Sequence, residues 1–129
     1  MEDVDIAELA ATTPTPFYVY SAGTMRARFK ELASAVNHPR VKIFFAVKAN
    51  SNIAVLSLLG KAGANMDIVS SGEMKRALAA GIPGNRIVFS GVGKTDDELA
   101  FALKNGVYQI NAESLPELTA INRVAAVLN

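Results

Sequence analysis

Four short apolar segments of this 129-residue chain end at a constant interval, and this spacing constrains the fold more than any other feature of the sequence. The segments are rich in β-branched and aromatic residues, and they end near positions 48, 69, 90 and 111, which are 21 residues apart each time. Each segment is followed by a longer one with helical periodicity, as expected of βα units around a parallel sheet. The pattern therefore predicts an α/β protein.

The predicted elements follow from this alternation. We expect strands at residues 41–47, 65–69, 86–89 and 107–110, preceded by an opening strand at residues 17–20. A helix with one buried apolar face should follow the opening strand, because four apolar residues recur there at helical spacing. These residues are Met25, Phe29, Leu32 and Val36.

Later helices are expected near residues 53–59, 72–80, 96–103 and 115–128. Two of them have a predicted start, because Thr95 with Glu98 and Ser114 with Glu117 show the spacing of a capping box. A closed (β/α)8 barrel contains eight such units in about 250 residues. Four units therefore predict that residues 1–129 form the N-terminal half of a barrel, with the rest of the barrel absent from the chain.

Composition excludes several classes of function. The net charge is +1, with 13 basic and 12 acidic residues, so the chain carries no electrostatic footprint for nucleic acid or for an anionic membrane. It has no cysteine and one histidine, which argues against disulfides and against a metal cluster. The first eleven residues are acidic, unlike a signal peptide, and a cytoplasmic location is expected.

Chemistry is expected where each strand gives way to polar residues, because ligands of parallel α/β proteins bind at the carboxyl ends of the strands. Eight residues occupy these ends: Lys48, Asn50, Asp67, Ser70, Ser90, Gly91, Asn111 and Glu113. Lys48 directly follows an apolar run that we expect to be buried on both faces. An ammonium there would be costly to desolvate, and a lysine that loses its proton easily is a nucleophile for carbonyl groups. The alternative, that Lys48 points into solvent, stays open at this stage.

Other candidates have structural alternatives of equal or greater weight. Asp67 lies within an apolar strand, so its carboxylate either needs a partner at a site or faces an edge. Glu73 stands three residues after Ser70, and a capping role is the better interpretation. Residues 91–95 end like a phosphate-binding P-loop, but Val88 occupies the position where that motif requires its first glycine. A dinucleotide fingerprint fails in the same segment, and His38 is expected at the surface.

The segment Phe44-Phe45-Ala46-Val47-Lys48-Ala49-Asn50-Ser51-Asn52 resembles the cofactor-lysine signature of the fold-type III pyridoxal-phosphate decarboxylases. Three further segments, at residues 15–20, 63–73 and 87–95, resemble the diaminopimelate decarboxylase branch of that family in particular. The four motifs occur in the family's order, and the resemblance runs from about Val4 to the end of the chain.

This resemblance implies a pyridoxal 5′-phosphate enzyme that decarboxylates meso-diaminopimelate to L-lysine, with a barrel, a C-terminal β domain and a homodimeric assembly. It implies that Lys48 holds the cofactor through a Schiff base and that Ala46 and Asp67 line it. The family roles of Glu73 and Glu113 are less firmly implied.

Several residues that the resemblance implies for a complete site do not occur in the chain. They are a histidine that stacks on the cofactor, a glycine-rich phosphate loop, an acidic partner of the ring nitrogen, and a cysteine and a tyrosine near the C-terminus. We therefore expect little or no decarboxylase activity from the chain alone. Two alternatives remain: a stand-alone half-barrel that works as a binding or assembly module, and another fold-type III enzyme, such as an amino-acid racemase or a carboxynorspermidine-type decarboxylase.

Overall fold

The four predicted strands form one parallel sheet. The structure, a computed structural model, describes residues 1–128 and orders the strands β1-β2-β3-β4. The strands are short, and they are β1 (Phe44–Ala46), β2 (Asn65–Ile68), β3 (Ile87–Phe89) and β4 (Gln109–Ile110). Each strand pairs with the next one along the chain, which confirms the α/β class and the succession of βα units expected from the spacing.

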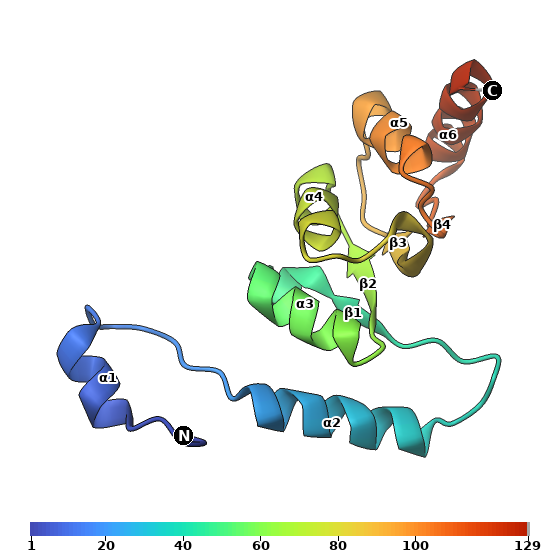
Figure 1. Ribbon diagram of the computed structural model, residues 1–129. Coiled ribbons are helices and arrows are strands. Elements are labelled where there is room, and N and C mark those ends of the chain that lie inside the picture. The colour runs from blue at the N-terminus through green and yellow to red at the C-terminus, as the bar shows by residue number, and fades with distance from the viewer. Residues whose placement is uncertain (129) are drawn as a thin grey trace.

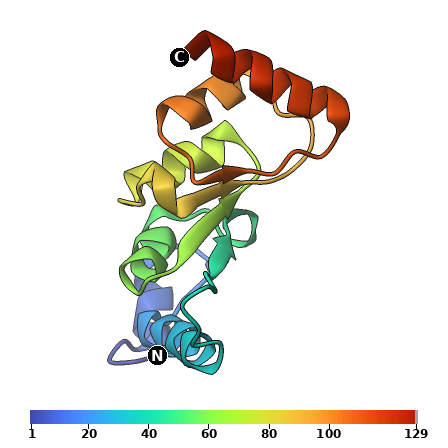
Figure 2. The ribbon, with the colours of Figure 1, turned by 90° about the vertical axis from the view of Figure 1, so that its right-hand side faces the viewer.

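A helix follows each strand, as predicted. The four helices are α3 (Ile53–Lys61), α4 (Ser71–Ala79), α5 (Asp96–Lys104) and α6 (Leu115–Leu128). Two single 3₁₀ turns complete the units: η1 (Val47–Ala49) directly after β1, and η2 (Gly84–Arg86) directly before β3. Figure 2 shows α3, α4 and α5 on one side of the strands, as expected when successive crossovers have the same hand.

The hydrophobic core lies between the sheet and these helices. On β2 the burial alternates, so that Met66 and Ile68 are fully buried while the residues next to them are not. Phe89 of β3 is the largest fully buried side chain, and Met74 of α4 and Leu99 of α5 in the helix layer are fully buried as well. Burying side chains of this size contributes about 1.5–3 kcal/mol each, so this face of the sheet provides most of the stability.

The N-terminal part of the chain departs from the prediction. No strand forms at residues 17–20 in the described structure; the segment is an irregular link between α1 (Ile6–Thr12) and α2 (Ala22–Ala35). The expected opening strand is therefore wrong, since no neighbouring strand offers the ladder of hydrogen bonds that a strand needs. Helix α1, which the apolar pattern did not indicate, begins at an Asp5 side chain that accepts from the Ala7 amide at 2.8 Å.

Helix α2 is confirmed, but only half of its expected apolar face is covered. Met25 and Phe29 pack against the core, whereas Leu32 is 49% exposed and Val36 is 38% exposed. Figure 1 shows α2 running beside α3 and shows α1 set apart from the sheet. The apolar spacing predicted the helix correctly, but it overestimated how much of the helix the rest of the chain covers.

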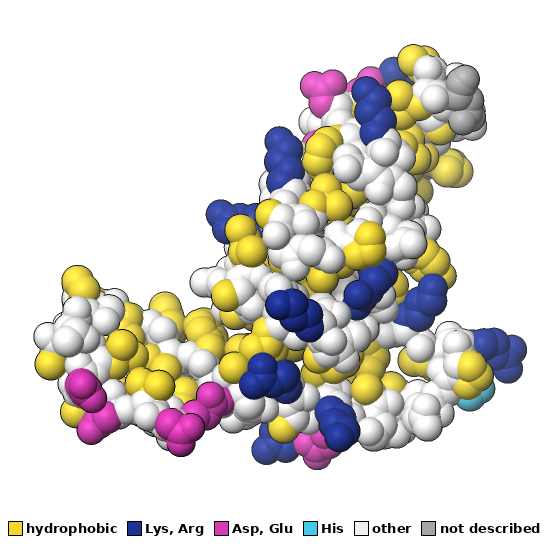
Figure 3. All heavy atoms as spheres, in the orientation of Figure 1, with side chains coloured by type: hydrophobic (Ala, Val, Ile, Leu, Met, Phe, Trp, Pro, Cys, Tyr) yellow, Lys and Arg dark blue, Asp and Glu magenta, His cyan; other side chains and the backbone are white. Residues whose placement is uncertain are grey.

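The N-terminal segment carries most of the acidic side chains on the face that Figure 3 shows, whereas Lys and Arg side chains are scattered over the remainder. One of the acidic residues has a defined role. Glu2 Oε1 accepts hydrogen bonds from the Ser21 hydroxyl and the Gly23 amide, both at 2.6 Å, and thereby caps the start of α2. The Ser21 hydroxyl is the main reason why the pKa of Glu2 lies below its ordinary value.

Among the described residues, no helix is long and apolar enough to span a bilayer.

Candidate functional site

A row of four hydrogen-bonded polar side chains crosses the carboxyl ends of β2, β3 and β4. The Ser90 hydroxyl donates to Asp67 Oδ1 at 2.6 Å, the Asn111 amide donates to Ser90 Oγ at 3.1 Å, and the Gln109 amide donates to Asn111 Oδ1 at 2.6 Å. We call these residues the polar row: Asp67, Ser90, Asn111 and Gln109. Every donor points along the row toward Asp67, so the Asp67 carboxylate is the final acceptor.

The polar row lies on the face of the sheet opposite the helices. Asp67 sits between Met66 and Ile68, which point into the core, and successive side chains of a strand face opposite ways. Ala46 pairs with Asp67 in register and precedes Val47, which is fully buried in the core. Two residues predicted to line a ligand, Ala46 and Asp67, are therefore neighbours on adjacent strands. The expectation that Asp67 needs a partner is met by Ser90.

Lys48 lies at the expected end of β1 but not in the expected environment. It falls within η1, because the chain leaves the sheet after Ala46 and turns, with the Asn50 amide donating to the Val47 carbonyl at 3.0 Å. Val47 takes the buried position and Lys48 is exposed. The expectation that Lys48 is buried by an apolar strand is thus wrong, since that strand ends one residue earlier than the sequence suggested, and the alternative of an exposed Lys48 is the one found. Its amine makes no hydrogen bond to any residue in the described part of the chain.

Three glutamates take part in capping the N-termini of α4, α5 and α6 at the carboxyl edge of the sheet. The predicted capping role of Glu73 is confirmed: its amide donates to Ser70 Oγ at 3.2 Å, and its carboxylate accepts from the Val69 amide at 2.8 Å. Glu98 completes the capping box predicted with Thr95. In α6 the Glu117 amide donates to Ser114 Oγ at 3.2 Å as predicted.

Two of these glutamates accept a further amide hydrogen bond, Glu98 from the neighbouring unit and Glu117 from within its own. Glu98 Oε1 accepts from the Ser71 amide of α4 at 3.0 Å, and this hydrogen bond is the main reason why the pKa of Glu98 lies below its ordinary value. Glu117 Oε2 accepts from the Glu113 amide at 2.7 Å, which is likewise the main cause of a lowered pKa at Glu117. Glu113, one of the polar residues predicted near the strand ends, contributes this backbone amide. The N-termini of α4, α5 and α6 are therefore occupied by carboxylates of the chain itself, whereas Asn52 caps α3.

Lys94 is the one buried charged residue in the described structure. Its amine donates to the Gly91 carbonyl, to the Asn111 carbonyl at 2.8 Å and to Glu117 Oε2 at 3.3 Å. In the sequence, Lys94 belonged to a rejected P-loop and to the family-like segment 87–95, but neither gave it a role. Its surroundings could not be inferred, because its partners come from a loop and a helix up to 23 residues away.

Gln109 was also missed as a member of the polar row. A signal for it existed, since Gln109 is a polar residue within the apolar run 107–110 and stands two positions before Asn111, on the same face of β4. Asn50 and Ser70, also predicted at strand ends, lie outside the row: the Asn50 side chain accepts from the Asn52 amide at 3.0 Å, and Ser70 caps α4.

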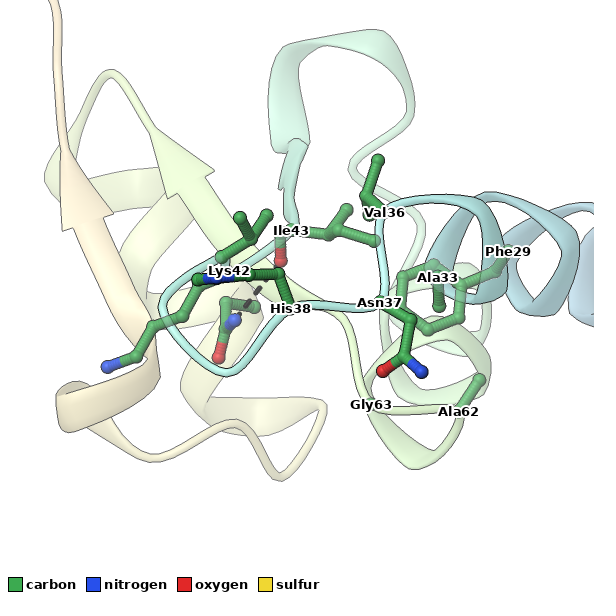
Figure 4. A pocket seen from close by; sticks show the side chains of 11 residues that line it. Phe29, Ala33, Val36, Asn37, His38, Lys42, Ile43, Ala62 and Gly63 are labelled. Atoms are coloured by element: carbon green, nitrogen blue, oxygen red, sulfur yellow. Dashed lines mark hydrogen bonds between the residues drawn. The ribbon is translucent and has the colours of Figure 1, made fainter.

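Two hollows flank β1 at opposite ends. One, of about 450 Å³, is mostly apolar and is lined by Ala49 and Asn50 beside Lys48 together with residues of α2 and α3. The other, of about 360 Å³, lies at the amino end of β1 between α2 and the following loop (Figure 4). His38 lines it and is exposed, as predicted. Only the first hollow is near the candidate lysine. No cluster of three or more metal-ligating side chains occurs among the described residues.

Comparison with known proteins places these residues in a family. Residues 22–128 match the family model described as pyridoxal-dependent decarboxylase, pyridoxal binding domain. The diaminopimelate decarboxylase of Pseudomonas aeruginosa is 46% identical over 98% of this chain, which covers 31% of that protein. The chain thus spans about a third of the length of the curated relatives it matches.

Two solved structures share the fold closely. The Aquifex aeolicus protein AQ1208 aligns with a TM-score of 0.92 and 45% identity, over 99% of this chain and 32% of that one. The diaminopimelate decarboxylase of Helicobacter pylori, solved in complex with L-lysine, aligns with a TM-score of 0.89 and 42% identity, over 96% and 32%. These matches confirm the predicted partial (β/α)8 barrel and the predicted resemblance. The chain belongs to the pyridoxal-dependent decarboxylase family, and the match to that family's pyridoxal-binding domain covers residues 22–128.

Proposed function

We propose that this chain carries the cofactor lysine of a decarboxylase that converts meso-diaminopimelate to L-lysine, and that this lysine is Lys48. The observation that carries the proposal is the position of Lys48, exposed at the carboxyl end of β1, two residues after Ala46, whose register partner is Asp67. The names of the relatives support the substrate, and the lysine complex of the Helicobacter pylori relative is consistent with the product.

The residues present fit pyridoxal phosphate, the cofactor of the family. An amine that is to bind an aldehyde carbon must be accessible and not already engaged, and Lys48 meets both conditions within the described structure. Ala46 has a small side chain, which leaves room beside the lysine. Asp67 uses Oδ1 to accept from Ser90, while its Oδ2 accepts no hydrogen bond from the described residues.

The roles we assign follow from these positions. Lys48 holds the cofactor through Nζ, Ala46 forms a wall beside it, and Asp67 offers Oδ2 as an oriented acceptor to the bound group. Pyridoxal phosphate, when bound, supplies an electron sink for the charge left after carbon dioxide departs.

Cofactor capture tests the assignment of Lys48. Purified protein is mixed with pyridoxal phosphate, its absorbance is recorded, and the adduct is reduced with borohydride and mapped by peptide mass spectrometry. We expect one modified lysine, Lys48, and no adduct there in Lys48→Ala. Lys61→Ala, which removes another exposed lysine, is the matched control and should label as the wild type does. Equal labelling of many lysines, or none at Lys48, would contradict the proposal.

The substrate can be tested on the loaded protein. We expect meso-diaminopimelate to change the absorbance of the bound cofactor at a lower concentration than arginine or ornithine does. A stronger response to either of the other amino acids would replace the proposed substrate while keeping Lys48 as the cofactor lysine. We further propose a cytoplasmic location.

The sheet edges support a second candidate, a module that assembles with a copy of itself or with a complementary half-barrel. β1 pairs only with β2 and β4 only with β3 in the described structure, so each has one edge without a strand partner. Such edges favour association with another chain. Light scattering after gel filtration should therefore give the mass of a dimer or a larger species. A monodisperse monomer across the accessible concentration range would contradict this candidate and the proposed homodimer.

A further inference from the structure

The charged side chain of Lys94 is almost completely buried, which is unusual for a lysine. Its side chain retains 1% of its exposure, although burying an ammonium is costly unless the charge is fully partnered. An ammonium has three protons to donate, and three acceptors receive them: the Gly91 and Asn111 carbonyls and Glu117. The side chain also passes the Phe89 ring, with Nζ 5.5 Å from its centre, which places Lys94 on the helix side of the sheet.

The two carbonyls belong to the backbone that carries the polar row. Gly91 directly follows Ser90, and Asn111 is itself a member of the row. The backbone amides of Ser90 and Asn111 extend the hydrogen-bond ladder of the parallel sheet. The Ser90 N–H donates to the Ile68 carbonyl at 2.8 Å, and the Asn111 N–H donates to the Phe89 carbonyl at 2.9 Å. Asn111 is therefore held at its amide by the sheet and at its carbonyl by Lys94.

The turn after Ser90 is tightly built as well. Gly91 has a φ of +84°, a left-handed conformation that glycine adopts without strain, and an added Cβ would stand 3.1 Å from Val69 Cβ. This backbone positions the Asn111 amide to donate to Ser90 Oγ and the Ser90 hydroxyl to donate to Asp67. Loss of the Lys94 amine would free two carbonyls on the helix side and loosen the row on the other side.

We propose that Lys94 is a positioning residue for Asp67, acting through the backbone of Gly91 and Asn111 on the Ser90–Asn111 pair. The inference rests on the proposed function only in that Asp67 faces the cofactor. Lys94 touches neither the cofactor lysine nor Asp67. From the helix side of the sheet, Lys94 orients the Asp67 carboxylate on the opposite face.

The first measurement needs no cofactor. Hydrogen exchange of the Asn111 side-chain amide is followed by NMR in the wild type, in Lys94→Met and in Arg123→Met. We expect Lys94→Met to speed this exchange about three- to tenfold, the effect of losing one net hydrogen bond. Arg123→Met, which removes the exposed ion pair with Asp96 between α5 and α6, should leave it unchanged. Unchanged exchange in Lys94→Met, or an equal rise in Arg123→Met, would overturn the proposal.

A double-mutant cycle separates positioning from general stabilisation. Lys94→Met and Ser90→Ala should each weaken cofactor capture, and the double variant should be no weaker than Ser90→Ala alone, because both act through the same row. Additive losses would make Lys94 a structural residue only. Lys94→Gln, whose amide can still donate to one carbonyl, replaces the methionine variant if the latter does not fold, with a smaller rise in exchange expected. Absence of capture in the wild type would count against the proposed function, whereas the exchange data would still decide the role of Lys94.

Discussion

The two faces of the sheet are made by alternate residues of the same strands, yet they serve different purposes. The face toward the helices is uniformly apolar, with Met66, Ile68 and Phe89 fully buried. The opposite face carries Asp67, Ser90 and the rest of the polar row, none of them fully buried. The contrast indicates that stability comes from the helix face. Our proposal assigns ligand binding to the other face, so substitutions should separate the two properties.

The largest effect is expected on the helix face. Phe89→Ala removes the largest fully buried side chain and should lower the free energy of unfolding by about 3–5 kcal/mol. Urea denaturation followed by circular dichroism measures this change. Ser90→Ala is the matched control, one residue further along the chain and on the opposite face, and it should cost about 1 kcal/mol. Equal losses from both variants would remove the distinction between the faces.

The next largest effect is expected on cofactor capture. Asp67→Ala should weaken the apparent affinity for pyridoxal phosphate about tenfold, the effect of losing a hydrogen bond to a charged group. The same variant should change the unfolding free energy by only about 1 kcal/mol, because it loses the one hydrogen bond from Ser90. Absorbance titration gives the first quantity and urea denaturation the second. Asp97→Ala, an exposed carboxylate on α5, is the control and should change neither.

Acidification tests the carboxylates that join the helix starts at the sheet edge. The pKa of Glu98 is lowered in the folded protein, chiefly by the Ser71 amide, so its stabilisation is present above the ordinary pKa of about 4.3. This stabilisation is lost as the pH falls through the lowered value. Thermal unfolding between pH 7 and pH 3 should show the decline, and Glu98→Gln should make it shallower. If stability fell with pH as steeply in Glu98→Gln as in the wild type, Glu98 would not be a source of the decline.

The smallest effect is expected from an exposed ion pair within the helix layer. Arg123 and Asp96 join α6 to α5 at 2.7 Å, but both side chains are more than half exposed. Arg123→Ala should therefore cost less than about 1 kcal/mol. A loss comparable to that of Phe89→Ala, measured in the same urea experiment, would mean that the helix layer is held by charge rather than by apolar packing.

Local signals in the sequence predicted most of the fold. The apolar runs and helical periods located four strands and the helices after them, and the Thr95–Glu98 capping box is present as expected. The strand expected at residues 17–20 did not form, because strand propensity is not sufficient without a neighbouring strand. The strand pattern also placed Asp67 near the carboxyl edge, whereas Ala46 was named only through the family resemblance. Their roles in binding cofactor, like that of Lys48, stay predictions.

The sequence by itself determined the order of the elements, the edge of the sheet where polar residues gather and, through its motif around Lys48, the family. Tertiary structure decided which of those polar residues meet. The exposure of Lys48 followed from a 3₁₀ turn that ends β1 early, and the burial of Lys94 followed from acceptors on the β3–α5 loop, at Asn111 beyond β4 and on α6. Periodicity reports the direction of a side chain relative to its own element, whereas a partner more than 20 residues away is fixed only when the strands align in register.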